Sequence, residues 1–178
     1  TVAKNTTVLL GPGQAFAEID GNLTVNGTLK ITGPVWVKGN ISGGVNASIK
    51  VDTSTGTNGA QIIADVPGSE GTVGTVDLRN NMVLQGNGNA GSYLMIMTTN
   101  TGASAMQIAN NADTVILYAP DGTVDASQNS STYQITANTL VLENNVQIVY
   151  QAGLQSEYFT SGPGGSWVFL PGTYAVGP

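Results

Sequence analysis

The sequence predicts an all-β protein whose single domain is a right-handed parallel β-helix, a β-solenoid, and three observations support this prediction. Glycine recurs every six residues, at Gly21, Gly27, Gly33 and Gly39. Charged residues make up only 9% of the chain, against about 25% in typical domains, so charged helix formers are scarce. Segments such as TVILYAP and NTLVLENNVQIVY are rich in residues that favour strands. A coil of short parallel strands accounts for all three observations.

Each of the four glycines opens a hexad, and the hexads read GNLTVN, GTLKIT, GPVWVK and GNISGG. Alternation along a strand directs the third and fifth places of each hexad to one face. The third places hold Leu23, Leu29, Val35 and Ile41, and the fifth places hold Val25, Ile31, Val37 and, as an exception, Gly43. We expect the glycines to permit bends at the corners, so that the strands wind around an apolar interior.

The handedness is predicted from the general chirality of parallel crossovers, which is right-handed. A left-handed hexapeptide helix is the structural alternative, because its period is also six. Its hexads usually bury one large aliphatic residue, whereas the hexads of this chain offer two. The right-handed form is therefore favoured.

The whole chain, residues 1–178, fits one domain, and its composition changes along the length. We expect residues 1–20 to form an entry or cap segment that covers one open end of the coil. The coils are expected to occupy residues 21–149, with a polar loop insertion at about 52–75. Residues 150–178 concentrate aromatic residues around a GPGG turn, which predicts a C-terminal aromatic strap on the end or flank of the coil.

Further apolar residues at alternate positions should continue the core beyond the hexads. Their spacing is irregular, which indicates coils of unequal length. The expected inward residues are Val45, Ile49, Val51, Val76, Leu78, Met82, Leu84, Leu94, Ile96, Met106, Ile108, Val115, Leu117, Leu140, Leu142, Val146 and Ile148.

Composition and charge argue against several classes of function. The formal net charge is −6 with only five cations, so the chain is poorly suited to a run of phosphates, and we expect no nucleic-acid partner. It contains no cysteine and no histidine, which removes thiolate metal sites and nucleophile–histidine pairs. No apolar run approaches the ~20 residues of a membrane span. We therefore expect neither an enzyme, nor a cofactor, nor a membrane span in this chain.

Two segments are apolar at successive positions, which burial of one strand face does not explain. They contribute Met95, Met97, Ile116 and Tyr118 as outward residues, and Trp36 is outward between Val35 and Val37. Something should cover such residues. The candidates for the two segments are the terminal segment of this chain, a protein partner or a neighbouring copy. For Trp36 they are the loop at 52–75, a partner or the ring of a glycan.

The segment DGTVD places Asp121 and Asp125 four residues apart beside a turn. Two carboxylates at this spacing could bind calcium or act as acid and base across a corner. The simpler interpretation is a turn, because Asp121–Gly122 follows Pro120, and aspartate and glycine are favoured there for backbone reasons. We favour the turn and keep both aspartates as weak calcium candidates.

Four segments in this order resemble the β-helical C-terminal domain of bacterial pilus-associated, type IV pilin-like surface proteins. They are GNLTVNGTLKITGPVWVKGNIS, DTVILYAPDGTVDAS, LVLENNVQIVYQAGL and SGPGGSW. In that family a YAP strand end precedes a coil, a Y…L element closes the helix, and a Gly/Pro segment with a tryptophan follows. The corresponding residues are Tyr118, Ala119 and Pro120, then Tyr150 and Leu154, then Gly162 to Trp167. The chain departs from the family at Gln151, where many members carry an acidic residue.

The resemblance implies a non-enzymatic, extracellular structural or adhesive module of a bacterial pilus or cell-surface assembly, with a protein partner. Two alternatives remain open. One is a β-helix that binds or cleaves polysaccharides, with a glycan as its ligand. The other is a polymerising scaffold of the bactofilin type, whose subunits stack end to end.

Overall fold

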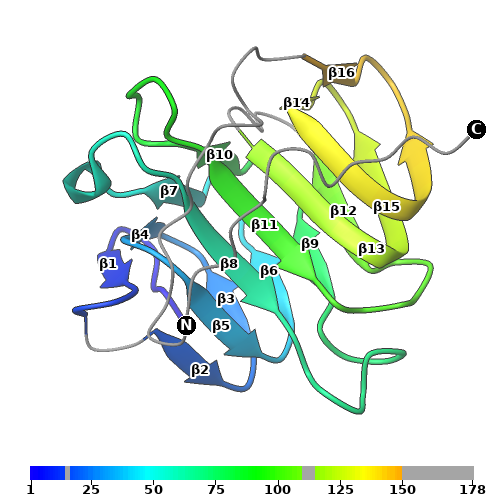
Figure 1. Cartoon of the computed structure of the whole chain (residues 1–178), viewed down its shortest axis with the longest axis horizontal. Helices are drawn as coiled ribbons and strands as arrows, with labels where there is room; N and C mark the ends of the chain where they lie inside the picture. The colour runs from blue at the N-terminus through cyan, green and yellow to red at the C-terminus, as the bar shows by residue number, and fades with distance from the viewer. Residues whose placement is uncertain (15–16, 110–114, 150–178) are drawn as a thin grey trace, which may run out of the picture.

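The computed structural model describes residues 1–14, 17–109 and 115–149 and shows a coil of parallel strands stacked level upon level (Figure 1). Every pairing between its strands is parallel. No α-helix occurs in these ranges. The predicted parallel β-helix is thereby confirmed. Its handedness remains a prediction.

The strands form three faces. Face A contains β2 (Glu18–Asp20), β5 (Val35–Lys38), β8 (Ala60–Ala64), β11 (Leu94–Thr98) and the first parts of β13 (Val115–Ser127) and β15 (Gln134–Leu142). Face B contains β3 (Leu23–Val25), β6 (Ile41–Gly43), β9 (Val76–Leu78), β12 (Met106–Ala109) and the second parts of β13 and β15. Face C contains β1 (Thr7–Leu10), β4 (Thr28–Ile31), β7 (Ser48–Val51) and β10 (Val83–Gln85), while β14 (Ser131–Thr132) and β16 (Gln147–Ile148) pair separately.

Each turn of the coil visits face C, face A and face B in that order, as β4, β5 and β6 show. β1 and β2, from the expected entry segment, pair in register with β4 and β5 and so belong to the first turn. The expected insertion at 52–75 contains β8, which divides it into two loops. The expected C-terminal strap lies outside the described residues, as do Tyr150, Leu154 and Trp167.

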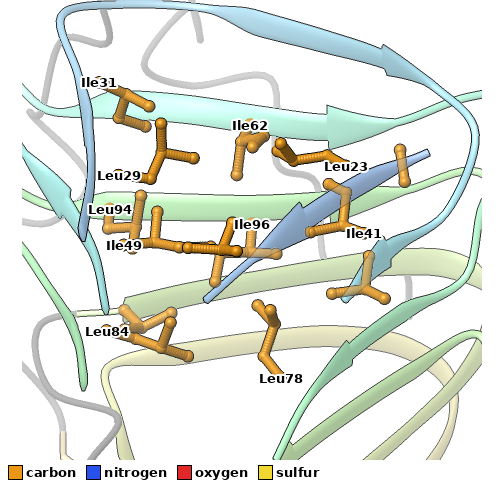
Figure 2. Close-up of a cluster of buried hydrophobic side chains, with 14 of the residues drawn as sticks. Leu23, Leu29, Ile31, Ile41, Ile49, Ile62, Leu78, Leu84, Leu94 and Ile96 are labelled. Carbon is orange, nitrogen blue, oxygen red and sulfur yellow. The ribbon is translucent and has the colours of Figure 1, made fainter. Parts of the chain in front are cut away.

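The hexads fill the interior as predicted (Figure 2). The third-place residues and the aliphatic fifth-place residues are all at most 3% exposed, and they stack with later inward residues such as Ile62, Leu78 and Ile96 in one cluster. Burial of this kind is worth about 1.5–3 kcal/mol for each large aliphatic side chain. The apolar column is therefore the main source of stability.

Some of the expected inward residues are not buried. Val45 is 68% exposed, because it lies in the turn that connects face B to face C. Leu140, Leu142 and Ile148 are 43%, 48% and 47% exposed, and Val146 is half-buried. The prediction that these residues are buried was wrong. Leu140 and Leu142 nevertheless keep inward positions, because they pair with the buried residues Val124 and Ala126.

Two of the hexad glycines serve close packing and not only bending. A Cβ atom on Gly27 would lie 2.2 Å from the carbonyl oxygen of Ala3, and one on Gly39 would lie 2.5 Å from the backbone of Gly21. Neither glycine has the positive φ that Gly21 shows. The backbones of successive levels approach so closely at these corners that no side chain fits between them.

The loop between β8 and β9 is held against the coil by asparagine side chains. The Oδ1 atom of Asn40 accepts hydrogen bonds from the backbone N–H groups of Gly74 and Thr75, at 2.8 and 3.0 Å. The Nδ2 atom of Asn100 donates to the carbonyl oxygen of Val73 at 2.7 Å. These bonds satisfy backbone groups that the loop itself leaves unpaired.

Candidate functional site

Face A carries a row of large side chains on its outer surface. The register of the strands places Trp36 beside Ile63, Ile63 beside Met97, and Met97 beside Tyr118. All four are half-buried, whereas their inward neighbours along each strand are buried. Four residues from β5, β8, β11 and β13 thus form one continuous row across four levels.

A second row flanks the first on the same face. Met95 pairs with Ile116, and Gln61 and Gln134 continue this row on either side. Met95 is half-buried and Ile116 is only 2% exposed. Ile116 is therefore outward by register but buried. We call Trp36, Ile63, Met95, Met97 and Tyr118 the outer apolar surface.

The structure therefore brings all five of the outward residues singled out in the sequence onto one face. Ile63, which lies between Trp36 and Met97 in this row, was not among the residues expected from the sequence. The signal was available: Ile62 and Ile63 are adjacent apolar residues in one strand, as in the two segments that were recognised. What the sequence could not supply was the register that makes these strands neighbours.

Trp36 is fixed at one end of the outer apolar surface. Its Nε1 atom donates a hydrogen bond to the carbonyl oxygen of Asp65 at 3.1 Å, and the Nζ atom of Lys38 lies 4.9 Å from its ring centroid. Asp65 belongs to the 52–75 segment, which agrees with the covering-loop interpretation of Trp36. A ring with its N–H bonded and an ammonium group over it is a poor stacking platform for a sugar.

Charged side chains border the outer apolar surface at the end that holds Trp36. Lys38 forms ion pairs with Glu18 and with Asp20, the latter at 3.4 Å. Hydrogen bonds to the two carboxylates raise the pKa of Lys38 above its usual range, and the bond to Glu18 has a larger effect than the bond to Asp20. The apolar part of the surface thus runs from Ile63 to Tyr118, with a charged cluster at the N-terminal edge.

Face B has a polar outer surface instead. One row contains Thr24, Ser42, Asp77, Gln107 and Asp125, and it ends at Val141 of β15. The name polar row is used below for three of these residues, Asp77, Gln107 and Asp125, which come from three successive levels.

Arg79 neutralises part of the polar row. It forms two hydrogen bonds to Asp77, from Nε to Oδ1 at 2.8 Å and from Nη2 to Oδ2 at 2.6 Å. These bonds lower the pKa of Asp77 below its usual range. They also raise the pKa of Arg79, to which the negative charge of Asp125 contributes a smaller part. A carboxylate held ionised in this way does not act as a general acid near neutral pH.

The two weak calcium candidates do not share a face row. Asp121 is exposed where β13 passes from face A to face B, whereas Asp125 is half-buried in the polar row. In the part of the chain that the structure describes, no group of three or more histidine, cysteine, aspartate or glutamate residues could hold a metal ion. A Cβ atom on Gly122 would lie 2.3 Å from the carbonyl oxygen of Asn100, so the glycine after Asp121 is needed for close packing at this corner.

The helical element of the described ranges is the 3-10 helix Thr53–Thr55, which is far too short to span a membrane. Comparisons with protein-family models, with curated proteins and with solved structures found no match for this chain. The outer apolar surface and the polar row are thus the two features from which a function can be argued.

Proposed function

We propose that this chain is a non-enzymatic structural or adhesive module of a bacterial pilus or cell-surface assembly, which acts outside the cell. The single observation that supports this proposal is the outer apolar surface, which is the contact that a protein partner would use. A stack of parallel levels with a continuous apolar core makes a rigid support. Loops and one apolar flank are then the parts available for contact.

The chemistry of the outer apolar surface suits a protein more than a sugar. Ile63, Met95 and Met97 offer aliphatic and thioether groups, and Tyr118 adds an aromatic ring at the far end. Protein interfaces are enriched in methionine and aromatic residues at their centres and are polar at their rims. The charged cluster around Lys38 supplies such a rim at one end.

The location and the contact can be tested together in the source organism. Antibodies against the purified chain should label intact cells, and the chain should co-purify with sheared surface filaments. Met97→Glu should reduce this co-purification at least tenfold, because it places a charge in the centre of the contact. Gln107→Glu, on the outer surface of face B, is the matched control and should behave as the wild type does.

Two results would contradict the proposal. One is a chain found only inside the cells. The other is a folded Met97→Glu variant that co-purifies with filaments as well as the control does. An unfolding midpoint close to that of the wild type shows that the variant is folded.

The polar row favours one second candidate, a module that binds or cleaves polysaccharides on face B. Carboxylate and amide groups at a regular spacing of about 4.8 Å can follow a row of sugar hydroxyls. Binding on a glycan array that disappears in Asp125→Asn, and persists in Met97→Glu, would support this candidate over the first.

A further inference from the structure

The fold places the methionines of this chain in two different environments. Met82 and Met106 are fully buried in the apolar column. Met95 and Met97 are half-buried on the outer apolar surface. The sequence contains four methionines, so the fold divides them equally between the interior and the outer face.

The two outer methionines lie two residues apart on β11. Alternation along the strand directs both side chains to the same side of face A, and their Cα atoms are about 7 Å apart. Met97 lies between Ile63 and Tyr118 across the strands. Met95 lies beside Ile116. The two thioethers therefore stand together in the apolar part of the surface.

Burial decides which of the methionine sulfur atoms a dissolved oxidant can reach. A reachable thioether is oxidised to a sulfoxide, which is polar and disrupts methionine-rich interfaces. Met82 and Met106 are each 0% exposed, so an oxidant reaches their sulfur atoms only when the coil opens, and core strands open rarely. Met95 and Met97 need no such opening.

We propose that Met95 and Met97 form a site of reversible oxidation, at which a peroxide converts both thioethers to sulfoxides and thereby switches off the contact made by the outer apolar surface. The position of the site rests on the burial of the methionines alone. The loss of the contact rests on the proposed function, because it concerns the same surface.

The reaction needs a peroxide as its only co-reactant. A lone pair of the sulfur attacks one oxygen of hydrogen peroxide, and an S–O bond forms as the O–O bond breaks. The departing hydroxide takes the proton from the transferred oxygen and leaves as water. The sulfur loses two electrons, which reduce the peroxide. Methionine sulfoxide reductases remove the oxygen again, one enzyme for each epimer of the sulfoxide, so the change is reversible.

The sulfoxides alter the contact surface without altering the core. Both side chains point away from the apolar column, so water can hydrate the new oxygen atoms while the buried residues keep their positions. A partner that covers the surface must remove this water, and a buried polar group without a hydrogen-bond partner costs free energy. Oxidation of Met95 and Met97 should therefore weaken binding and leave the unfolding midpoint almost unchanged.

Treatment of the full-length folded chain with hydrogen peroxide tests the position of the site. Samples are quenched with free methionine at intervals, and tandem mass spectrometry locates each added oxygen. Met95 and Met97 should be oxidised at least about tenfold faster than Met82 and Met106. In denaturing urea all four should react at similar rates, which attributes the protection to the fold. Similar rates in the folded chain, or outer methionines as slow as the buried pair, would overturn the site.

Filament binding tests the effect on the contact. The purified chain is oxidised until Met95 and Met97 have reacted, freed of peroxide, and added to surface filaments sheared from the source cells. Its co-purification should fall at least about fivefold, and methionine sulfoxide reductases for both epimers should restore it. Met95→Leu with Met97→Leu is the matched variant, because it keeps apolar side chains and lacks the two sulfur atoms. Compared with its own untreated sample, it should be unaffected by peroxide.

The remaining outcomes separate this proposal from the proposed function. An oxidised wild type that co-purifies as well as the untreated one overturns the switch, and so does an equal loss in the leucine variant. If the untreated wild type does not co-purify either, the proposed function and the switch both fail. The selective oxidation of Met95 and Met97 is judged by the mass measurement alone.

Discussion

Gly43 stands where the hexad pattern fails, and in the structure the side chain of Met82 occupies the space beside it. A Cβ atom on Gly43 would lie 1.6 Å from the sulfur of Met82, which is itself fully buried. Met82 thus fills the space that a fifth-place valine would occupy. Gly43 has no positive φ, so Gly43→Ala tests this packing without backbone strain.

The expected cost follows from two opposing contributions. Forcing a methyl group into a filled core costs about 1–3 kcal/mol, whereas replacing glycine by alanine inside a strand recovers about 0.5–1 kcal/mol. We therefore expect Gly43→Ala to lower the free energy of unfolding by about 1 kcal/mol, which is the difference between the middle values of these two ranges. Met82→Ala alone should cost about 2–5 kcal/mol through the cavity that it leaves.

The double variant separates a steric clash from a general loss of stability. With Met82 shortened, the methyl group of Ala at position 43 enters the cavity, so the double variant should be at least about 1 kcal/mol more stable than additivity predicts. Urea unfolding followed by circular dichroism measures all four proteins. Gly71→Ala is the control, because the nearest atom to its added Cβ is 3.9 Å away. The reasoning is refuted if Gly43→Ala is as harmless as the control, or if the two changes are additive.

Three further predictions concern polar contacts. Trp36→Phe removes the hydrogen bond to the carbonyl oxygen of Asp65 and should lower the free energy of unfolding by about 0.5–1.5 kcal/mol. It should also speed amide hydrogen exchange in the loop after β8. Unchanged exchange would show that Trp36 does not hold this loop. The pKa of Asp52 is lowered because the backbone N–H of Ser54 and the Lys30 ammonium favour the charged carboxylate. The charged carboxylate therefore stabilises the folded state above the unfolded pKa of about 3.9. This stabilisation is lost as the pH falls through the lower pKa of the folded state. Asp52→Asn should therefore flatten the decline of the unfolding midpoint between about pH 4 and pH 2. The asparagine keeps an acceptor for the N–H of Ser54 at the start of the 3-10 helix Thr53–Thr55. An unchanged decline would argue against a stabilising charge on Asp52. Asn40→Ala leaves the backbone N–H groups of Gly74 and Thr75 unpaired and should lower the free energy of unfolding by about 1–3 kcal/mol. Asn40→Asp keeps the acceptor and should lower it less. Equal losses in the two variants would show that the hydrogen bonds to Asn40 contribute little.

The core of the fold could be predicted because period-two alternation is local information. Leu23, Leu29 and Val35 are buried as expected, since each sits at the same place in a repeated hexad. The exception at Gly43 could not be explained from the hexads, because its cause is Met82, which comes from the next level and lies 39 positions further along the sequence. Contacts of this kind depend on loop lengths that the sequence pattern does not reveal.

The candidate site was predictable by residue type but not as a surface. Met97 and Tyr118 were recognisable because apolar neighbours within one strand leave one side chain outward. Their contact depends on the register between β11 and β13, and Ile63 joins them only through the register of β8. The exposure of Leu140 was mispredicted for a related reason. Its inward position was correct, but in the described residues no further level covers β15.

The most direct test of the account is the distance along the outer apolar surface. Nitroxide labels on Ile63→Cys and Tyr118→Cys sit on either side of Met97 in the same row, two levels apart, so their Cα atoms should be about 10 Å apart. The account predicts strong dipolar broadening of the doubly labelled spectrum in frozen solution. A spectrum equal to the sum of the two singly labelled ones would contradict it, because these residues would then not share one surface.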